Sequence, residues 1–293
     1  MAIKKTKGDR IFITINTVFM TLLMLVTLYP LLYVAFASIS DPTSMIKHTG
    51  LLLRPLGFQL DAYGMVMDNP MILQGYKNTL VYVLLGTLIN LVMTCLGAYV
   101  ISRKKFGMKK AITFAIIFTM FFNGGLIPTF LIVKDLGMYN SIWALLIPNA
   151  INTYNLIIMR TSFMSIPETL EEAAIMDGAN DFTILFRVVI PLSMPVVAVM
   201  ILFYGVAHWN SWFNAMIYIR DRSLYPLQLV LREILVASST ESMTASVGNM
   251  DKEPVSEIVK YATIMVATIP ILFVYPFLQR FFVKGVMIGA IKG

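Results

Sequence analysis

Six long stretches of the chain carry no Asp, Glu, Lys or Arg, and short polar segments separate them. These charge-free stretches are 19 to 32 residues long, whereas the next longest has 9 residues. They cover residues 11–40, 78–102, 111–133, 136–159, 188–219 and 261–279. About 20 mostly apolar residues are enough for a helix to cross a bilayer. The pattern therefore predicts an all-α integral membrane protein with six transmembrane helices.

The composition supports a membrane protein, because 58% of the residues are hydrophobic and only 13% are charged. A soluble domain carries about 25% charged residues. The apolar part of the first stretch is longer than the roughly 7–15 residues of a signal-peptide core, so we expect a retained helix. We interpret residues 1–293 as a single transmembrane domain.

Basic residues indicate which ends of the predicted helices face the cytoplasm. They gather in residues 1–10, 103–110 and 280–293, where Asp9 is the one acid. Cytoplasmic loops are enriched in Lys and Arg, so these segments and both termini are predicted to be cytoplasmic. Residues 41–77 and 220–260 balance bases against acids and are predicted to lie outside. The net charge of +7 thus reflects topology and does not indicate nucleic-acid binding.

Prolines and glycines interrupt several of the apolar stretches. Gly124, Gly125 and Pro128 lie in the third stretch, Pro148 lies in the fourth, and Pro195 opens the main part of the fifth. A proline inside a membrane helix frees backbone groups that neighbouring helices or water must satisfy. These residues predict kinks, which suit a protein that lines a pathway and changes shape.

The loop at residues 160–191 contradicts the charge trend. It is predicted to be cytoplasmic, yet it holds five carboxylates and two basic residues. The carboxylates belong to Glu168, Glu171, Glu172, Asp177 and Asp181. Such a loop is not suited to the lipid surface, so we expect a basic protein partner.

The acidic loop predicts two short helices joined at a glycine. Ser165 and Glu168 have the spacing of a capping box, and Pro167 can occupy the first turn. Gly178 is placed to end this helix in the left-handed conformation. The small side chains of Ala173 and Ala174 would allow a partner to approach closely.

The second predicted helix begins at a cap formed by Asn180 or Asp181 and ends at Pro191. Its apolar residues recur at helical spacing: Phe182, Leu185, Phe186 and Val189. Leu170, Phe182 and Phe186 are candidate anchors for a groove in the partner.

One pattern in this loop resembles a known signature. It reads Glu172-Ala173-Ala174, three residues, Gly178, nine residues, and residues 188–191 as Val-Val-Ile-Pro. This is similar to the signature of permease subunits of ATP-binding-cassette importers. Segments 29–32, 136–141 and 285–293 resemble the carbohydrate branch, specifically the second of its two unlike permeases, as in maltose-type systems. The resemblance covers nearly the whole chain.

The resemblance implies a type I importer fold, in a bacterial cytoplasmic membrane, with several partners. These are a second, homologous permease that forms a heterodimer, two ATPase subunits and an extracytoplasmic solute-binding protein. The loop at 160–191 would be the coupling helix that docks on the ATPase. Its implied docking residues are Glu168, Glu171, Glu172, Ala173, Ala174, Asp177, Gly178, Phe182 and Pro191.

Two further segments receive implied roles from the same resemblance. The tail at 284–293 would reach between the ATPases through Gly289, Lys292 and Gly293. The outer loop at 220–260 would touch the binding protein. The chain has no glycine-rich phosphate loop, so ATP and Mg would be bound by the partner ATPase. We expect no catalytic residue, no metal and no cofactor in this chain.

Polar and aromatic residues in the apolar stretches are candidates for contact with a saccharide. Asn149, Asn152 and Thr153 have helical spacing in the fourth stretch, and His208 lies in the fifth. Hydrogen bonding between helices, an interfacial aromatic belt and packing of His208 are the alternatives. The candidate pathway residues are Asn123, Asn149, Asn152, Tyr154, Tyr204, His208, Trp209, Asn210, Trp212 and Asn214.

Two segments bear on the kind of cargo. Segments 123–128 and 251–255 resemble importers of acidic glycans such as aldouronates or alginate. A neutral maltose-type oligosaccharide is the alternative. A secondary transporter would need an ion site, but the apolar stretches contain no carboxylate. A membrane enzyme would need a catalytic cluster, which is also missing from them, and a scaffold would not require the glycine spacing.

Overall fold

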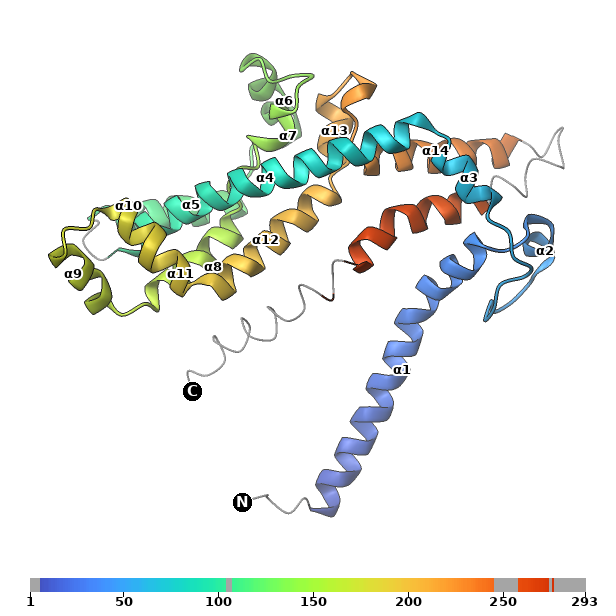
Figure 1. Cartoon of the computed structure of the whole chain (residues 1–293), viewed down its shortest axis with the longest axis horizontal. Coiled ribbons are helices and arrows are strands. Elements are labelled where there is room, and N and C mark those ends of the chain that lie inside the picture. Colours follow the sequence, from blue (N-terminus) through green and yellow to red (C-terminus); the bar gives the residue numbers. More distant parts are fainter. Residues whose placement is uncertain (1–5, 104–106, 245–257, 274–275, 277–293) are drawn as a thin grey trace. The chain divides into compact units, whose positions relative to one another are not determined.

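In the computed structural model the chain is helical, and the residues that the structure describes, 6–103, 107–244, 258–273 and 276, contain no strand (Figure 1). They form two compact units. The first unit joins residues 1–69 to residues 231–269, and the second joins residues 70–230 to residues 270–293. The prediction of an all-α protein is confirmed.

The first unit is built around α1 (Lys7–Ser38), α2 (Pro42–Lys47), α3 (Asp61–Met67) and most of a helix at Ile258–Phe273. Large apolar side chains cover α1, and most of them are exposed. Near its end, the Ser38 and Tyr63 hydroxyls lie 2.8 Å apart, and the Leu52 amide donates to the Tyr29 hydroxyl at 3.1 Å. These contacts fix α1 to the polar segment that follows it.

The second unit is built along α4 (Pro70–Ser102), which packs against α8 (Thr153–Met164) and α12 (Met194–Trp209). The remaining elements are α5 (Lys109–Phe121), α6 (Leu126–Asp135), α7 (Trp143–Leu146), α9 (Glu168–Met176), α10 (Asp181–Ile184), a π-helical turn (Leu185–Val189), α11 (Ile190–Leu192), α13 (Phe213–Tyr218), a 3-10 turn (Arg222–Leu224) and α14 (Leu227–Thr244), of which residues from 231 onward belong to the first unit. A buried cluster joins α4, α8, α10 and α12. The acidic loop is therefore packed against the helices on either side of it.

Two helices, α1 and α4, are long and apolar enough to cross a bilayer, and two bent helix pairs raise this number to at most four within the described residues. The pair α5 and α6 bends by 115° at residues 122–125, and the run Asp181–Leu192 meets α12 at 87°. Gly124 and Gly125 thus lie in a break between two helices, whereas Pro128 and Pro195 lie in the first turns of α6 and α12. The six-span topology and the cytoplasmic termini stay predictions, as does a single domain over 1–293.

The fourth apolar stretch is not one helix. Residues 147–152 form turns and coil between α7 and α8. Asn149 therefore does not share a helix face with Asn152 and Thr153, and the predicted helical spacing is wrong. Pro148 contributes to the difference, because it has no N–H group to donate to a helical carbonyl, and Ile147 before it, the C-cap of α7, is the last residue there with helical backbone.

The acidic loop as a candidate docking site

Gly178 joins α9 to α10 with a positive φ of 81°, as predicted. The Ala179 amide donates to the Ala174 carbonyl at 2.9 Å, and the Gly178 amide donates to the Ile175 carbonyl at 2.9 Å. This pair of bonds is a Schellman motif. The motif needs a residue with left-handed backbone four positions after Ala174, whose carbonyl accepts the bond that spans five residues. The spacing between Ala174 and Gly178 thus has a local physical reason.

The start of α9 differs from the prediction. Ser165 ends α8 and does not form a capping box with Glu168. The N-cap of α9 is Pro167, which has no side-chain group that can accept a hydrogen bond. The α8 helix continues to Met164, so the chain has too few residues left for a separate capping turn.

Asn180 is the N-cap of α10, which selects one of the two predicted caps. Its Oδ1 accepts from the Thr183 amide at 2.8 Å. Asn180→Ala is expected to destabilise this helix start by about 1 kcal/mol, because the Thr183 amide loses its acceptor. Hydrogen exchange at Thr183 measures the effect, with Asn180→Asp as the control that keeps an acceptor. Equal protection in the alanine variant and the native chain would contradict the role.

The helix that follows Asn180 does not end at Pro191, contrary to the prediction. It runs through the π-helical turn and continues to Leu192, and the bend lies at Ser193. The Ser193 amide donates to the Val189 carbonyl at 3.1 Å. A π-turn widens the backbone directly before the proline, so the missing N–H of Pro191 is tolerated.

The inner side of the loop is part of the protein core. Ile184, Leu185 and Val189 are almost completely buried and belong to one cluster with Tyr99 of α4 and Phe163 of α8. Of the four side chains predicted to share one helix face, Leu185 and Val189 are therefore buried, whereas Phe182 and Phe186 are exposed. This burial ties the second half of the loop to α4 and α8.

The outer side of the loop exposes large apolar residues among its carboxylates. Met176 is 88% exposed and Phe182 is 66% exposed. Leu170, Ile175 and Phe186 are also exposed. Apolar side chains gathered in an acidic setting are typical of a surface that a protein partner covers. The predicted anchors Leu170, Phe182 and Phe186 are thus accessible, and their docking role stays a prediction.

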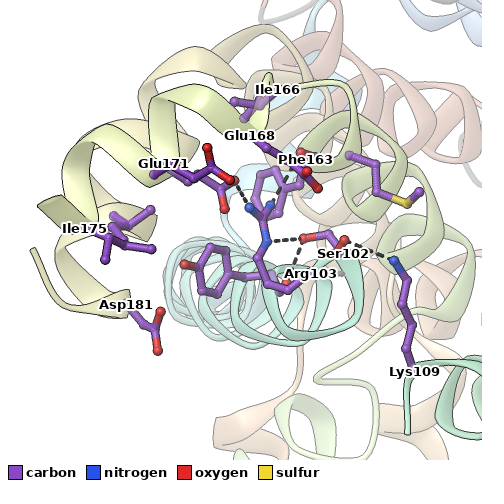
Figure 2. Close-up of a pocket in the computed structure, with 13 residues that line it drawn as sticks. Ser102, Arg103, Lys109, Phe163, Ile166, Glu168, Glu171, Ile175 and Asp181 are labelled. Carbon is purple, nitrogen blue, oxygen red and sulfur yellow. Dashed lines mark hydrogen bonds and ion pairs between the residues drawn. The ribbon is translucent and has the colours of Figure 1, made fainter. Parts of the chain in front are cut away.

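A pocket of about 450 Å³ lies beside α9 at the C-terminal end of α4 (Figure 2). Arg103 is at its centre and forms an ion pair with Glu171. Its Nε donates to Ser102 Oγ at 2.9 Å, and its Nη2 donates to the Phe163 carbonyl at 3.4 Å. The guanidinium also lies 4.7 Å from the centre of the Tyr99 ring. One side chain therefore connects α4, α8 and α9.

The charge of Arg103 is partly withdrawn from water. Burial lowers the pKa of its guanidinium, while Tyr99, Glu168 and Asp181 raise it. An arginine keeps its proton at neutral pH in spite of such a shift. Glu171, predicted to meet a basic partner, thus meets a basic residue of its own chain.

Two more cations bind the C-terminal end of α4. Lys109 Nζ donates to the Ser102 carbonyl at 3.1 Å, and Arg160 Nε donates to the Ile101 carbonyl at 3.2 Å. The last carbonyls of a helix lack partners within the helix and carry partial negative charge. Basic residues beside the acidic loop therefore also donate hydrogen bonds to the last carbonyls of α4.

Three of the predicted pathway residues contact α4, namely Asn149, Tyr204 and His208, and the Asn152 amide donates to the Tyr204 hydroxyl. His208 Nε2 is 2.6 Å from Asn90 Oδ1, and the Tyr204 hydroxyl is 2.7 Å from Thr94 Oγ1. Asn152 Oδ1 caps α8 by accepting from the Asn155 amide at 3.1 Å. These partners are protein groups, which favours the alternative of hydrogen bonding between helices.

The other pathway candidates are distributed over several elements. Asn123 Oδ1 accepts from the Gly125 amide at 2.8 Å between α5 and α6, and Tyr154 on α8 is 56% exposed. Trp209 lies 6.3 Å from Tyr76 between ring centroids. Asn210 ends α12, Trp212 precedes α13, and Asn214 lies within α13. The structure does not bring all ten candidates into one site.

Sequence reasoning missed Arg103 and Asn90. In the sequence Arg103 is one of several basic residues that indicate orientation, and nothing in its neighbourhood distinguishes it from Lys104 or Lys105. Asn90 lies at the midpoint of the stretch 78–102, where a lone amide is a usable signal. The predicted tail residues Gly289, Lys292 and Gly293 lie outside the described residues.

Comparison with known proteins gives matches along almost the entire chain. The chain is 39% identical over 288 residues to the polygalacturonan/rhamnogalacturonan transport system permease protein YtcP of Bacillus subtilis (strain 168), covering 97% of this chain and 99% of that protein. It is 38% identical to protein LplC of the same organism, covering 98% and 97%. No protein-family model matches the chain.

A solved structure also matches. It is the crystal structure of a bacterial ABC transporter involved in the import of the acidic polysaccharide alginate. One of its chains superposes with a TM-score of 0.85 and 34% sequence identity, covering 95% of this chain and 99% of that chain.

Proposed function

Because the chain belongs to the family of permease subunits of carbohydrate ATP-binding-cassette transporters, we propose that it imports an oligo- or polysaccharide across the cytoplasmic membrane. Members of this family are non-catalytic subunits, and the chain is a membrane transport component and not an enzyme. The similarity to YtcP over almost both full lengths is the observation that carries the proposal.

The proposed assembly contains this chain, a second permease, two ATPases and an extracytoplasmic binding protein. The two permeases form the pathway, and this chain contributes one half of it. ATP and Mg bind to the ATPases. The exposed apolar surface of α1 is available for lipid or for the second permease. The loop at 220–260 contacts the binding protein, and the tail at 284–293 contacts the ATPases.

The acidic loop is the proposed docking site for an ATPase. Its exposed side offers Glu172, Ala173, Asp177 and Phe182, and Gly178 sets the angle between its two helices. Its buried side is packed into the core that includes α4, α8 and α12. Arg103 adds a charged tie between α9 and α4. A displacement of the loop by the ATPase therefore moves α4, α8 and α12 as well.

The proposed cargo is a fragment of an acidic polysaccharide. One similar protein is named for the transport of polygalacturonan, and another belongs to a transporter involved in the import of alginate. Both of these polymers carry carboxylates. This chain offers amides, aromatic rings and His208 in its apolar stretches, so the second permease would supply the positive charges that hold an anionic glycan. A neutral oligosaccharide is the alternative cargo.

Uptake by the assembled transporter in vesicles distinguishes the two kinds of cargo. Oligogalacturonate, oligoalginate and a maltodextrin of similar length are offered separately, together with ATP and the binding protein. We expect uptake of a uronate and little uptake of the maltodextrin. Uptake of the maltodextrin with refusal of both uronates would overturn the acidic cargo and leave the transporter class intact.

A further inference from the structure

A fully buried amide lies at the middle of α4. Asn90 is 1% exposed and occupies the midpoint of the apolar stretch 78–102. An amide at the centre of a membrane helix is costly unless each of its polar atoms has a partner. Its partners therefore indicate why the chain keeps an amide at this position.

Both polar atoms of the Asn90 side chain have partners. Its Nδ2 donates to the Asn149 carbonyl at 2.7 Å and to the Ala150 carbonyl at 3.0 Å. Because both hydrogens go to carbonyls, Oδ1 faces His208 and accepts from Nε2 at 2.6 Å. Asn90 thus connects α4 to α12 and to residues 147–152, which we name the α7–α8 break.

A second connection lies one helical turn away. The Tyr204 and Thr94 hydroxyls are 2.7 Å apart, and the Asn152 amide donates to the Tyr204 hydroxyl at 3.4 Å. Asn90 and Thr94 are four residues apart on α4, and Tyr204 and His208 are four residues apart on α12. Residues with this spacing lie on the same helix face. These four residues form two matched rungs, which we name the polar ladder.

The backbone of α4 is shaped for the ladder. Gly86 lies one turn from Asn90, and a Cβ atom at this position would overlap the His208 ring. The glycine lets α12 approach closely enough for His208 to reach Asn90. Small residues at helix contacts have this role in membrane proteins.

The ladder lies away from the acidic loop along the same helices. The loop occupies the end of the bundle where α8 ends and α12 begins (Figure 1). The break lies at the opposite end of α8, because α8 begins at Thr153 and ends at Met164. His208 lies in the last turn of α12. The buried core extends from the loop along these helices as far as Tyr204, and the ladder continues the contact between α4 and α12 to His208.

We propose that the polar ladder locks the α7–α8 break to α4 and α12, so that these segments move as one rigid body when the transporter changes state. Asn90 and Tyr204 are positioning residues in this role, and neither needs to touch the cargo. His208 and Asn149, considered above as pathway residues, belong to the lock. The consequence for transport rests on the proposed function, whereas the rigid connection does not.

Distances between spin labels test the rigid connection in the assembled transporter. The single cysteine, Cys95, is replaced by alanine, and labels are placed at Leu88 on α4 and Ile151 in the break. Both positions are exposed, at 58% and 43%. We expect one narrow distance distribution that is the same without nucleotide and with trapped ATP. A distance that shifts between these two states would overturn the proposal.

Variants then test whether the ladder is the cause. Asn90→Leu keeps a similar volume and leaves two buried carbonyls without a donor, whereas Tyr204→Phe removes a single hydroxyl and is the milder change. Each variant is expected to broaden the distribution of label distances and to lower the uptake per ATP hydrolysed. For Asn90→Leu the uptake per ATP should fall about tenfold, because the free energy lost when buried polar groups have no partner corresponds to about that factor. Unchanged distributions and coupling in Tyr204→Phe would contradict the role of its rung.

Two matched controls separate the lock from general damage to the helices. Thr87→Val changes a buried hydroxyl of α4 for which the described residues provide no hydrogen-bond partner. Gly205→Ala on α12 adds a Cβ at an ordinary contact distance of 3.9 Å, in contrast to Gly86→Ala. Both controls are expected to keep the narrow distribution, and Gly86→Ala is expected to lose it. Equal broadening in the controls would overturn the proposal, whether or not the native complex transports a saccharide.

Discussion

Replacing Gly178 with valine is expected to abolish most saccharide uptake while ATP hydrolysis continues. The native φ of 81° is unfavourable for a residue with a side chain, by about 1–2 kcal/mol and by more for a β-branched one. Relief of this strain breaks the Schellman bonds and turns α10 relative to α9. Uptake and ATP hydrolysis are measured in the same vesicles, and uptake per ATP should fall about tenfold or more.

Two other glycines serve as controls for this variant. Gly137 has a similar φ of 71° and open space around it, but it lies in the turn after α6. Gly137→Val should cost similar stability and leave the coupling ratio unchanged. Gly107 has open space and ordinary backbone, so Gly107→Val should have little effect on either quantity. Equal loss of coupling in the Gly178 and Gly137 variants would show that strain alone is responsible.

Reversing the charge of Arg103 is expected to be the second large effect. Arg103→Glu places a carboxylate opposite Glu171 and beside other acids of the pocket. Both side chains of the native pair are mostly buried, at 20% and 13% exposure, so repulsion there should destabilise the position of α9 by about 2 kcal/mol or more. We expect ATP hydrolysis that depends weakly on the binding protein, and strongly reduced uptake.

The reciprocal exchange distinguishes a specific pair from a general charge effect. Arg103→Glu combined with Glu171→Arg should recover a large part of the uptake, because the ion pair is restored in the opposite sense. Lys110→Glu, at an exposed lysine near the same pocket, is the matched control and should stay close to native uptake. Failure of the double exchange, together with a similar loss in the lysine variant, would contradict the role of Arg103 as a tie.

The turn at Gly178 and the cap at Asn180 could be predicted because both depend on a few neighbouring residues. A left-handed glycine four residues after an alanine, followed by an N-cap, is a local pattern with local hydrogen bonds. The acidic loop was recognisable for the same reason. The charges of a short segment and the spacing of its residues can be read directly from the sequence.

The tie at Arg103 and the polar ladder could not be predicted, because they join segments that are about 60 to 120 residues apart. Hydropathy also failed at the fourth apolar stretch, where a charge-free run contains a break. A buried asparagine on another helix satisfies the freed carbonyls, so the sequence near Pro148 gives no sign of its partner. Tertiary hydrogen bonds decide where such a run stops being helical.

ATP-dependent accumulation of saccharide in reconstituted vesicles tests the central claim most directly. The chain is assembled with its second permease, its ATPases and its binding protein, and each component is left out in turn. The account predicts accumulation in the full complex with ATP and none when the ATPases are absent. Accumulation by this chain alone, or by the complex without ATP, would contradict it.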